Sequence, residues 1–182
     1  MEVRLLSPAQ LEAVHNRLLA FCRKYGDSRL TAAALRELRE LKAEELAAPE
    51  SAAARPAGRS AAAGTANAGG AAGSWVPASR EPRRTAAVAV AVGGGRLAGV
   101  AFAADAGERA CLVAVRPEAR GRGTGASLLL ALRSRWGRLS CSVAADNPAS
   151  MQMCFRAGMK AVGLFAGPTG KPTLRFESEP EN

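Results

Sequence analysis

The stretch that decides the fold is Val115-Arg-Pro-Glu-Ala-Arg-Gly-Arg-Gly-Thr-Gly125. An apolar run at 110–115 leads into it, and residues 126–136 follow with leucines at helical spacing. This order predicts a strand, a glycine-rich basic turn and a helix. Glycine lets an anion approach the backbone closely, and the N–H groups at a helix N-terminus attract negative charge. The stretch therefore predicts a site for a phosphate or pyrophosphate group.

The composition favours a globular protein with an anionic ligand. The chain has 182 residues, 48% of them apolar, and a formal net charge of +9. This length is enough for one domain with a hydrophobic core. The basic charge points to a phosphorylated small molecule or to nucleic acid. Proteins that bind nucleic acid usually carry a basic stripe with interleaved aromatic residues, or a known module. The sequence has neither, so we do not expect a nucleic-acid partner.

The cysteines and the N-terminus bear on metals and on the compartment. The four cysteines form no CxxC pair and the chain has a single histidine, His15, so we expect no metal site. The first residues lack the apolar core of a signal peptide. No window approaches the about 18 apolar residues of a membrane span. We therefore expect a cytoplasmic protein that does not attach to a membrane.

The first half of the chain predicts two helices and then an insertion. Ser7-Pro8-Ala9-Gln10 has the pattern of a capping box with proline at the first helical position. A second helix is expected to run to about residue 48. The following segment, about 49–84, is rich in alanine and glycine without sustained periodicity. We interpret it as a flexible, low-complexity insertion that interrupts one domain of residues 1–182.

Strands and helices alternate after the insertion. The expected elements are a hairpin of 85–92 and 96–103, a strand at 109–115, a helix at 126–136, a strand at 139–144, a helix at 148–157 and a hairpin of 160–166 and 172–177. We expect Met151, Cys154 and Phe155 to form the buried face of the helix at 148–157. The whole order predicts an α/β (α+β) fold, a mixed sheet with helices on its faces.

Two motifs resemble the GNAT superfamily of N-acetyltransferases. Arg120-Gly-Arg-Gly123-Thr-Gly125 matches the family's cofactor turn, Arg/Gln-x-x-Gly-x-Gly/Ala, and the common Val-x-Pro precedes it. The helix at Asn147-Pro-Ala-Ser150, which ends in Gly158-Met159, is similar to the family's Asn-x-x-Ala/Ser-x-x-x-Tyr-x-x-x-Gly-Phe signature. The resemblance spans the chain outside the insertion. It implies a GNAT-like, mostly antiparallel central sheet of about seven strands flanked by about four helices.

The resemblance also implies acetyl-CoA as co-substrate and an amine as acceptor, in a monomer or a homodimer. Backbone N–H groups of the turn would hold the pyrophosphate, and two arginines would add charge. The strand edge before the turn would bind the pantetheine arm like an extra strand. The implied cofactor-binding residues are Val113, Ala114, Val115, Arg120, Gly121, Arg122, Gly123, Thr124, Gly125, Ala126, Asn147 and Ser150.

The chemistry implied by the family is direct transfer in a ternary complex. A neutral amine attacks the thioester, and a backbone N–H of strand 109–115 stabilises the oxyanion. Cys154 stands where the family has its tyrosine and is the candidate acid for the leaving thiolate, with solvent as the alternative. Glu108 is the first candidate for a general base. Asp105 and Asp146 are weaker candidates.

Three alternatives stay open. Gly121-Arg-Gly-Thr-Gly-Ala126 also fits a dinucleotide fingerprint, but it follows an antiparallel hairpin and lacks a suitably placed acidic residue. The main rival is a GNAT-like domain that binds acetyl-CoA or a partner as a sensor or interaction module, without catalysis. The third is a basic protein associated with nucleic acid, whose affinity would fall steeply with salt.

Overall fold

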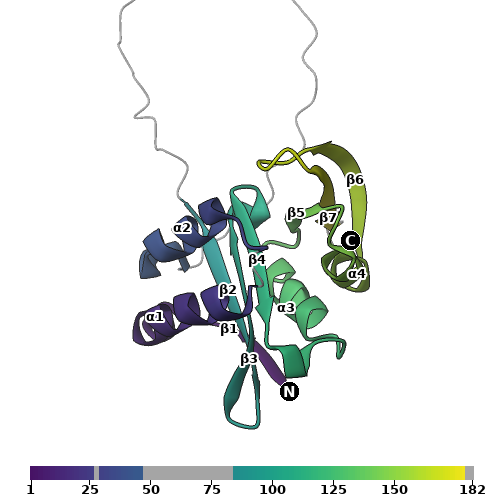
Figure 1. The fold of residues 1–182 in the computed structure, drawn as a ribbon. Coiled ribbons are helices and arrows are strands. Elements are labelled where there is room, and N and C mark those ends of the chain that lie inside the picture. The colour runs from purple at the N-terminus through teal and green to yellow at the C-terminus, as the bar shows by residue number, and fades with distance from the viewer. Residues whose placement is uncertain (27–28, 47–83, 179–182) are drawn as a thin grey trace, which may run out of the picture.

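Seven strands and four α-helices make up the part of the chain that the computed structural model describes, residues 1–26, 29–46 and 84–178 (Figure 1). The strands are β1 (Glu2–Leu5), β2 (Ala86–Gly93), β3 (Arg96–Ala104), β4 (Ala110–Val115), β5 (Ser140–Ala144), β6 (Met159–Ala166) and β7 (Pro172–Ser178). The helices are α1 (Pro8–Tyr25), α2 (Ala32–Glu40), α3 (Thr124–Arg133) and α4 (Pro148–Arg156). The predicted α+β class is confirmed.

The strands form two antiparallel sheets. The first has the order β1-β2-β3-β4, and the second has the order β5-β7-β6. The sequence predicts one mixed sheet, and the structure refines this, because β4 and β5 are neighbours that share no backbone ladder. A strand followed by a helix and a further strand brings the two strands side by side in parallel. The junction of the two sheets therefore lies between β4 and β5.

Helices cover the first sheet on both faces (Figure 1). Val100 and Phe102, both 0% exposed, belong to the core beneath α1 and α2. Ala101 and Ala103 alternate with them and face α3, where Leu128 is also 0% exposed. The small alanine side chains leave room for the leucines of α3. This sheet is thus the centre of the molecule.

The second sheet is covered mainly by α4. Phe176 of β7 and Cys154 of α4 are 0% exposed in the core between them. The prediction that Phe155 is buried is wrong, because the residue is 56% exposed; its ring packs edge to face with that of Phe176, with ring centroids 5.2 Å apart. β6 is an edge strand, exposed along almost its whole length.

The N-terminal helices begin as their sequences predict. Ser7 caps α1, and both hydrogen bonds of the capping box with Gln10 are present. α2 ends at Glu40, earlier than predicted, and a 3-10 turn follows at Ala43–Leu46. All of the predicted insertion except residue 84 lies outside the described residues, as does the end of the predicted second helix. In the described part of the chain, no helix is both long and apolar enough to cross a membrane.

Candidate functional site

On the edge of β4 that faces β5, the backbone groups form no ladder of hydrogen bonds with another described strand. The N–H of Arg116 donates to the carbonyl of Ala98 at 2.9 Å, so the groups of even-numbered residues of β4 point toward β3. The backbone groups of Val113 and Val115 therefore point the other way, toward β5. This edge can bind an extended ligand as a further strand would bind, through the N–H and C=O groups of Val113 and the N–H of Val115, because the Val115 carbonyl accepts from Arg120 Nε.

The glycine turn opens onto free space at the end of this edge. Gly121 and Gly123 have positive φ angles of 72° and 80°, and nothing lies within 4 Å of where their Cβ atoms would stand. Gly123 is the N-cap of α3, and no side chain caps the helix. The first N–H groups of α3 are thus available to a ligand from the direction of the turn. An anion fits this position because the helix N-terminus carries partial positive charge.

The next three residues of the turn contribute backbone, while their side chains pack inward. The Thr124 hydroxyl is buried and donates to the carbonyl of Ala119 at 2.8 Å. A Cβ on Gly125 would overlap the sulfur of Met153, so glycine permits α3 and α4 to pack closely here. Ala126 is also buried. The buried side chains of Thr124 and Ala126 thus support the turn.

The two arginines of the turn have different surroundings. Arg120 donates from Nε to the carbonyl of Val115 at 2.9 Å and from Nη2 to the carbonyl of Tyr25 at 3.2 Å. It therefore ties the turn to β4 and to the end of α1. Arg122 is exposed at the tip of the turn. Of the two, Arg122 has the freer approach to a phosphate in solution.

The structure adds three residues to the turn that the sequence does not single out. The guanidinium of Arg116 lies 5.2 Å from the ring centroid of Tyr25, and Lys24 Nζ lies 5.4 Å from the same centroid. The chain's one tyrosine thus gathers two cations beside Arg120. Arg116 is the middle residue of the Val-x-Pro motif, so the sequence places it beside the turn. Nothing in the sequence links it to the end of α1.

The second motif, which runs from Asn147 to Met159, shapes its own helix, α4. The Asn147 side chain accepts from the N–H of Ser150 at 3.2 Å and so caps α4. Ser150 is half-buried in the first turn. The amide NH₂ of Asn147 remains a potential donor. The motif positions α4 against α3.

The structure does not support Cys154 as an acid. Its side chain is fully buried, and its Sγ lies 3.5 Å from Sγ of Cys141. The contact with Cys141 and burial raise the pKa of Cys154 far above the ordinary value. Such a thiol stays protonated, but it has no path to a leaving group outside the core.

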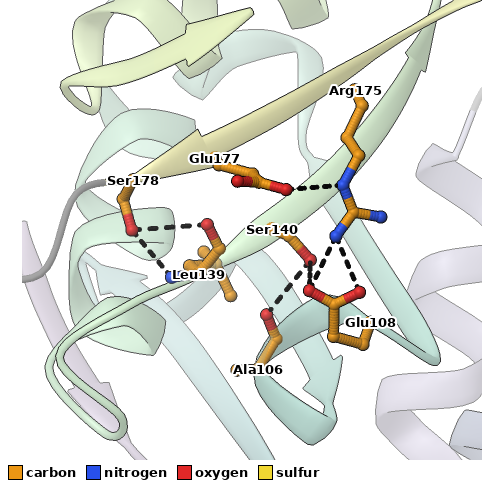
Figure 2. Close-up of polar contacts among 7 residues, drawn as sticks. All are labelled: Ala106, Glu108, Leu139, Ser140, Arg175, Glu177 and Ser178. Atoms are coloured by element: carbon orange, nitrogen blue, oxygen red, sulfur yellow. Dashed lines mark hydrogen bonds and ion pairs between the residues drawn. The ribbon is translucent and has the colours of Figure 1, made fainter. Parts of the chain in front are cut away.

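Glu108 is held in an ion-pair network that argues against its role as a base. Figure 2 shows its carboxylate accepting two hydrogen bonds from Arg175 Nη2, both at 2.7 Å, and one from the Ser140 hydroxyl at 3.1 Å. The hydrogen bond with Arg175 is the main cause that lowers the pKa of Glu108. A carboxylate stabilised in its charged form is a weaker proton acceptor.

The two weaker base candidates are also engaged. Asp105 accepts from the N–H of Thr85 at 2.9 Å and forms an ion pair with Arg109 at 3.4 Å. Asp146 pairs with Lys171 at 2.6 Å, which is the main cause of its lowered pKa, and with Arg29 at 3.4 Å. Both carboxylates are therefore held by cationic partners.

Comparison with solved structures shows which proteins share this fold. A spermidine N-acetyltransferase of Vibrio cholerae (SpeG) aligns over 98% of this chain and 94% of its own, with a TM-score of 0.51 and 14% sequence identity. The acetyltransferase AAC(6')-Ib, solved with ribostamycin and coenzyme A, aligns over 97% and 91%, with a TM-score of 0.54 and 12% identity. Its complex with kanamycin and coenzyme A aligns over 97% of this chain and 92% of its own, with a TM-score of 0.53 and 13% identity. No family model matches the sequence, and no curated protein matches it significantly. The chain has the fold of the GNAT acetyltransferases.

Proposed function

We propose that this chain, with its GNAT fold, transfers an acetyl group from acetyl-CoA to an amine. The observation that carries the proposal is the uncapped N-terminus of α3, which opens through Gly121 and Gly123 beside the unpaired edge of β4. The first feature can bind a pyrophosphate, and the second can bind an extended arm that contains amides. AAC(6')-Ib, a protein with this fold, has been solved in complex with coenzyme A and ribostamycin, and with coenzyme A and kanamycin.

In the proposed complex, the pyrophosphate binds the N–H groups from Gly121 to Ala126, with Arg122 beside it. The pantetheine arm runs along Val113 and Val115 between β4 and β5. A backbone N–H of this edge faces the thioester oxygen and stabilises the negative charge that develops when a neutral amine attacks. The chain mainly orients the two reactants. Solvent supplies and removes the protons, since Cys154 and Glu108 are otherwise engaged.

The proposed acceptor is a small amine. The solved neighbours are a spermidine acetyltransferase and an enzyme complexed with aminoglycosides, both of which offer primary amines. A panel of spermidine, kanamycin, free amino acids and lysine peptides covers the main classes. The rival function, binding without catalysis, predicts stabilisation by acetyl-CoA and no release of coenzyme A thiol with any of these amines.

The experiment compares acetyl-CoA binding by the unmodified chain and by two charge-matched variants. Arg122→Glu reverses a charge at the turn, and Arg36→Glu reverses an exposed charge on α2. We expect acetyl-CoA to raise the melting temperature, and Arg122→Glu to weaken its affinity about five- to tenfold, as loss of a charge-assisted contact does. Arg36→Glu should leave the affinity unchanged. Absence of stabilisation in the unmodified chain would refute the proposal.

A further inference from the structure

Polar contacts join the two sheets at the start of β4 and β5. Because β4 and β5 share no ladder, side chains have to define their separation. A Cβ on Gly107 would overlap the carbonyl of Ser140, so glycine allows the backbone before β4 to meet the start of β5. The Ser140 hydroxyl then donates to Glu108 at 3.1 Å. The two strands are therefore in close contact at this end.

Arg175 extends this contact to a third strand. Its Nη2 donates to both carboxylate oxygens of Glu108 at 2.7 Å, and its Nε donates to Glu177 at 2.7 Å (Figure 2). The planar guanidinium holds its partners in a fixed geometry, which a lysine ammonium does not. Glu108, two residues before β4, is thereby fixed to the first residue of β5 and to the middle of β7.

The position of this cluster relates it to the β4 edge. Arg175 and Glu177 flank the buried Phe176 on β7, so both point away from α4. Glu108 precedes β4, whereas the glycine turn follows it. β4 spans about 17 Å between these two ends at the usual rise per residue. The turn would hold the phosphate end of an extended ligand, and the cluster defines the other end of the same edge.

We propose that Glu108 and Arg175 form a positioning pair, which fixes β5 against the start of β4 and so sets the space beside Val113 where the thioester reacts. This inference rests on the proposed acetyl transfer. A mutation far from the reacting atoms that misplaces them by about 1 Å can lower a rate about 100-fold, because attack requires aligned reactants. Neither residue touches the reactants in this arrangement.

The first test measures kcat and KM for acetyl-CoA in Glu108→Gln, Arg175→Gln and the double variant. We expect each single variant to lower kcat about 10- to 100-fold and to leave KM within about threefold, because the turn still binds the phosphates. The double variant should lose no more than either single one, since both act through one contact. The kcat of Arg175→Lys should lie between that of the unmodified chain and that of Arg175→Gln. Glu44→Gln, which breaks the exposed pair with Lys42, is the control and should match the unmodified chain.

The pH dependence separates a positioning role from a base role. If Glu108 only positions β5, Glu108→Gln lowers kcat/KM equally at every pH and Arg175→Gln does the same. Loss of an ionisation from the profile of Glu108→Gln alone, with full activity in Arg175→Gln, would overturn the inference. So would kcat values within twofold of the unmodified chain in both single variants.

A second readout does not depend on activity. Cys111 of β4 is half-buried and contacts Cys141 of β5, and the other three cysteines of the chain are buried. We expect iodoacetamide to modify Cys111 about three- to tenfold faster in Glu108→Gln and Arg175→Gln than in Glu44→Gln, because the strands separate. Unchanged alkylation would overturn the inference even in an active enzyme. An unmodified chain that binds acetyl-CoA but transfers nothing would instead contradict the proposed function.

Discussion

The two sheets differ in what covers them. In the first sheet, strand residues such as Val88 and Phe102 are 0% exposed, because helices lie on both faces. In the second sheet, Val162, Leu164 and Phe165 of β6 are 54%, 68% and 44% exposed. Both sheets contain apolar strands, so the sequence of a strand does not determine its burial. The proposed site lies at the junction of the buried sheet and the exposed one.

This contrast assigns different tasks to the two sheets. The first sheet and its helices hold most of the core and present the edge of β4 from a rigid support. The second sheet is fixed by α4 and by the polar contacts at the start of β5. We therefore expect changes in the first sheet to act on global stability. Changes at the junction should act on the geometry of the β4 edge, and on stability where they force atoms to overlap, whereas changes on β6 should cost less stability than changes in the first sheet.

The largest expected effect compares two strand phenylalanines. Phe102→Ala should lower the free energy of unfolding by about 3–5 kcal/mol, because it leaves a cavity in a closed core. Phe165→Ala should cost less than about 1.5 kcal/mol, because its ring is already 44% exposed. Urea unfolding measures both. Equal losses would show that β6 is covered in solution and that the contrast between the sheets is wrong.

A smaller effect compares two glycines with positive φ angles. Gly107→Ala and Gly121→Ala share the cost of a left-handed conformation, about 1–2 kcal/mol. Only Gly107→Ala also forces a Cβ into the backbone of Ser140, which adds about 1–3 kcal/mol. The difference between the two melting temperatures isolates the close approach of the sheets. A loss for Gly121→Ala as large as for Gly107→Ala would contradict this close approach.

The smallest effect is a pH dependence at the junction. Hydrogen bonding to Arg175 lowers the pKa of Glu108 from an ordinary value of 4.5. The pair therefore stabilises the fold fully above about pH 4.5, and this contribution is lost as the pH falls through the lowered value. Unfolding curves between pH 3 and 6 should show a smaller decline for Glu108→Gln than for the unmodified chain. The side chain is 45% exposed, so the difference should be modest.

Local sequence was sufficient where short-range contacts determine the structure. The capping box at Ser7 and the N-terminal start of the helix at Asn147 follow the sequence, because each cap depends on a neighbour three residues away. The predicted helix at 126–136 ends at Arg133 in the structure, and a turn completes it. Boundaries shift by a few residues because the last turns depend on tertiary packing.

The roles of individual side chains at the site could not be predicted in this way. Glu108 and Arg175 are 67 residues apart, and no local pattern in either segment predicts that they form a pair. Cys154 stands where the resembling motif has a tyrosine, but its complete burial depends on what packs around it. Such contacts depend on how β5 and β7 are placed beside β4.

By itself, the sequence determined the order of strands and helices and the glycine turn at residues 121–125, because glycine conformations and helix starts are local properties. Only the tertiary structure decided that the turn opens at the end of an unpaired strand edge, and that a carboxylate suggested as a base is bound by an arginine. The physical reason is that ion pairs and strand separations depend on distances between segments far apart in the chain, which the local pattern does not encode.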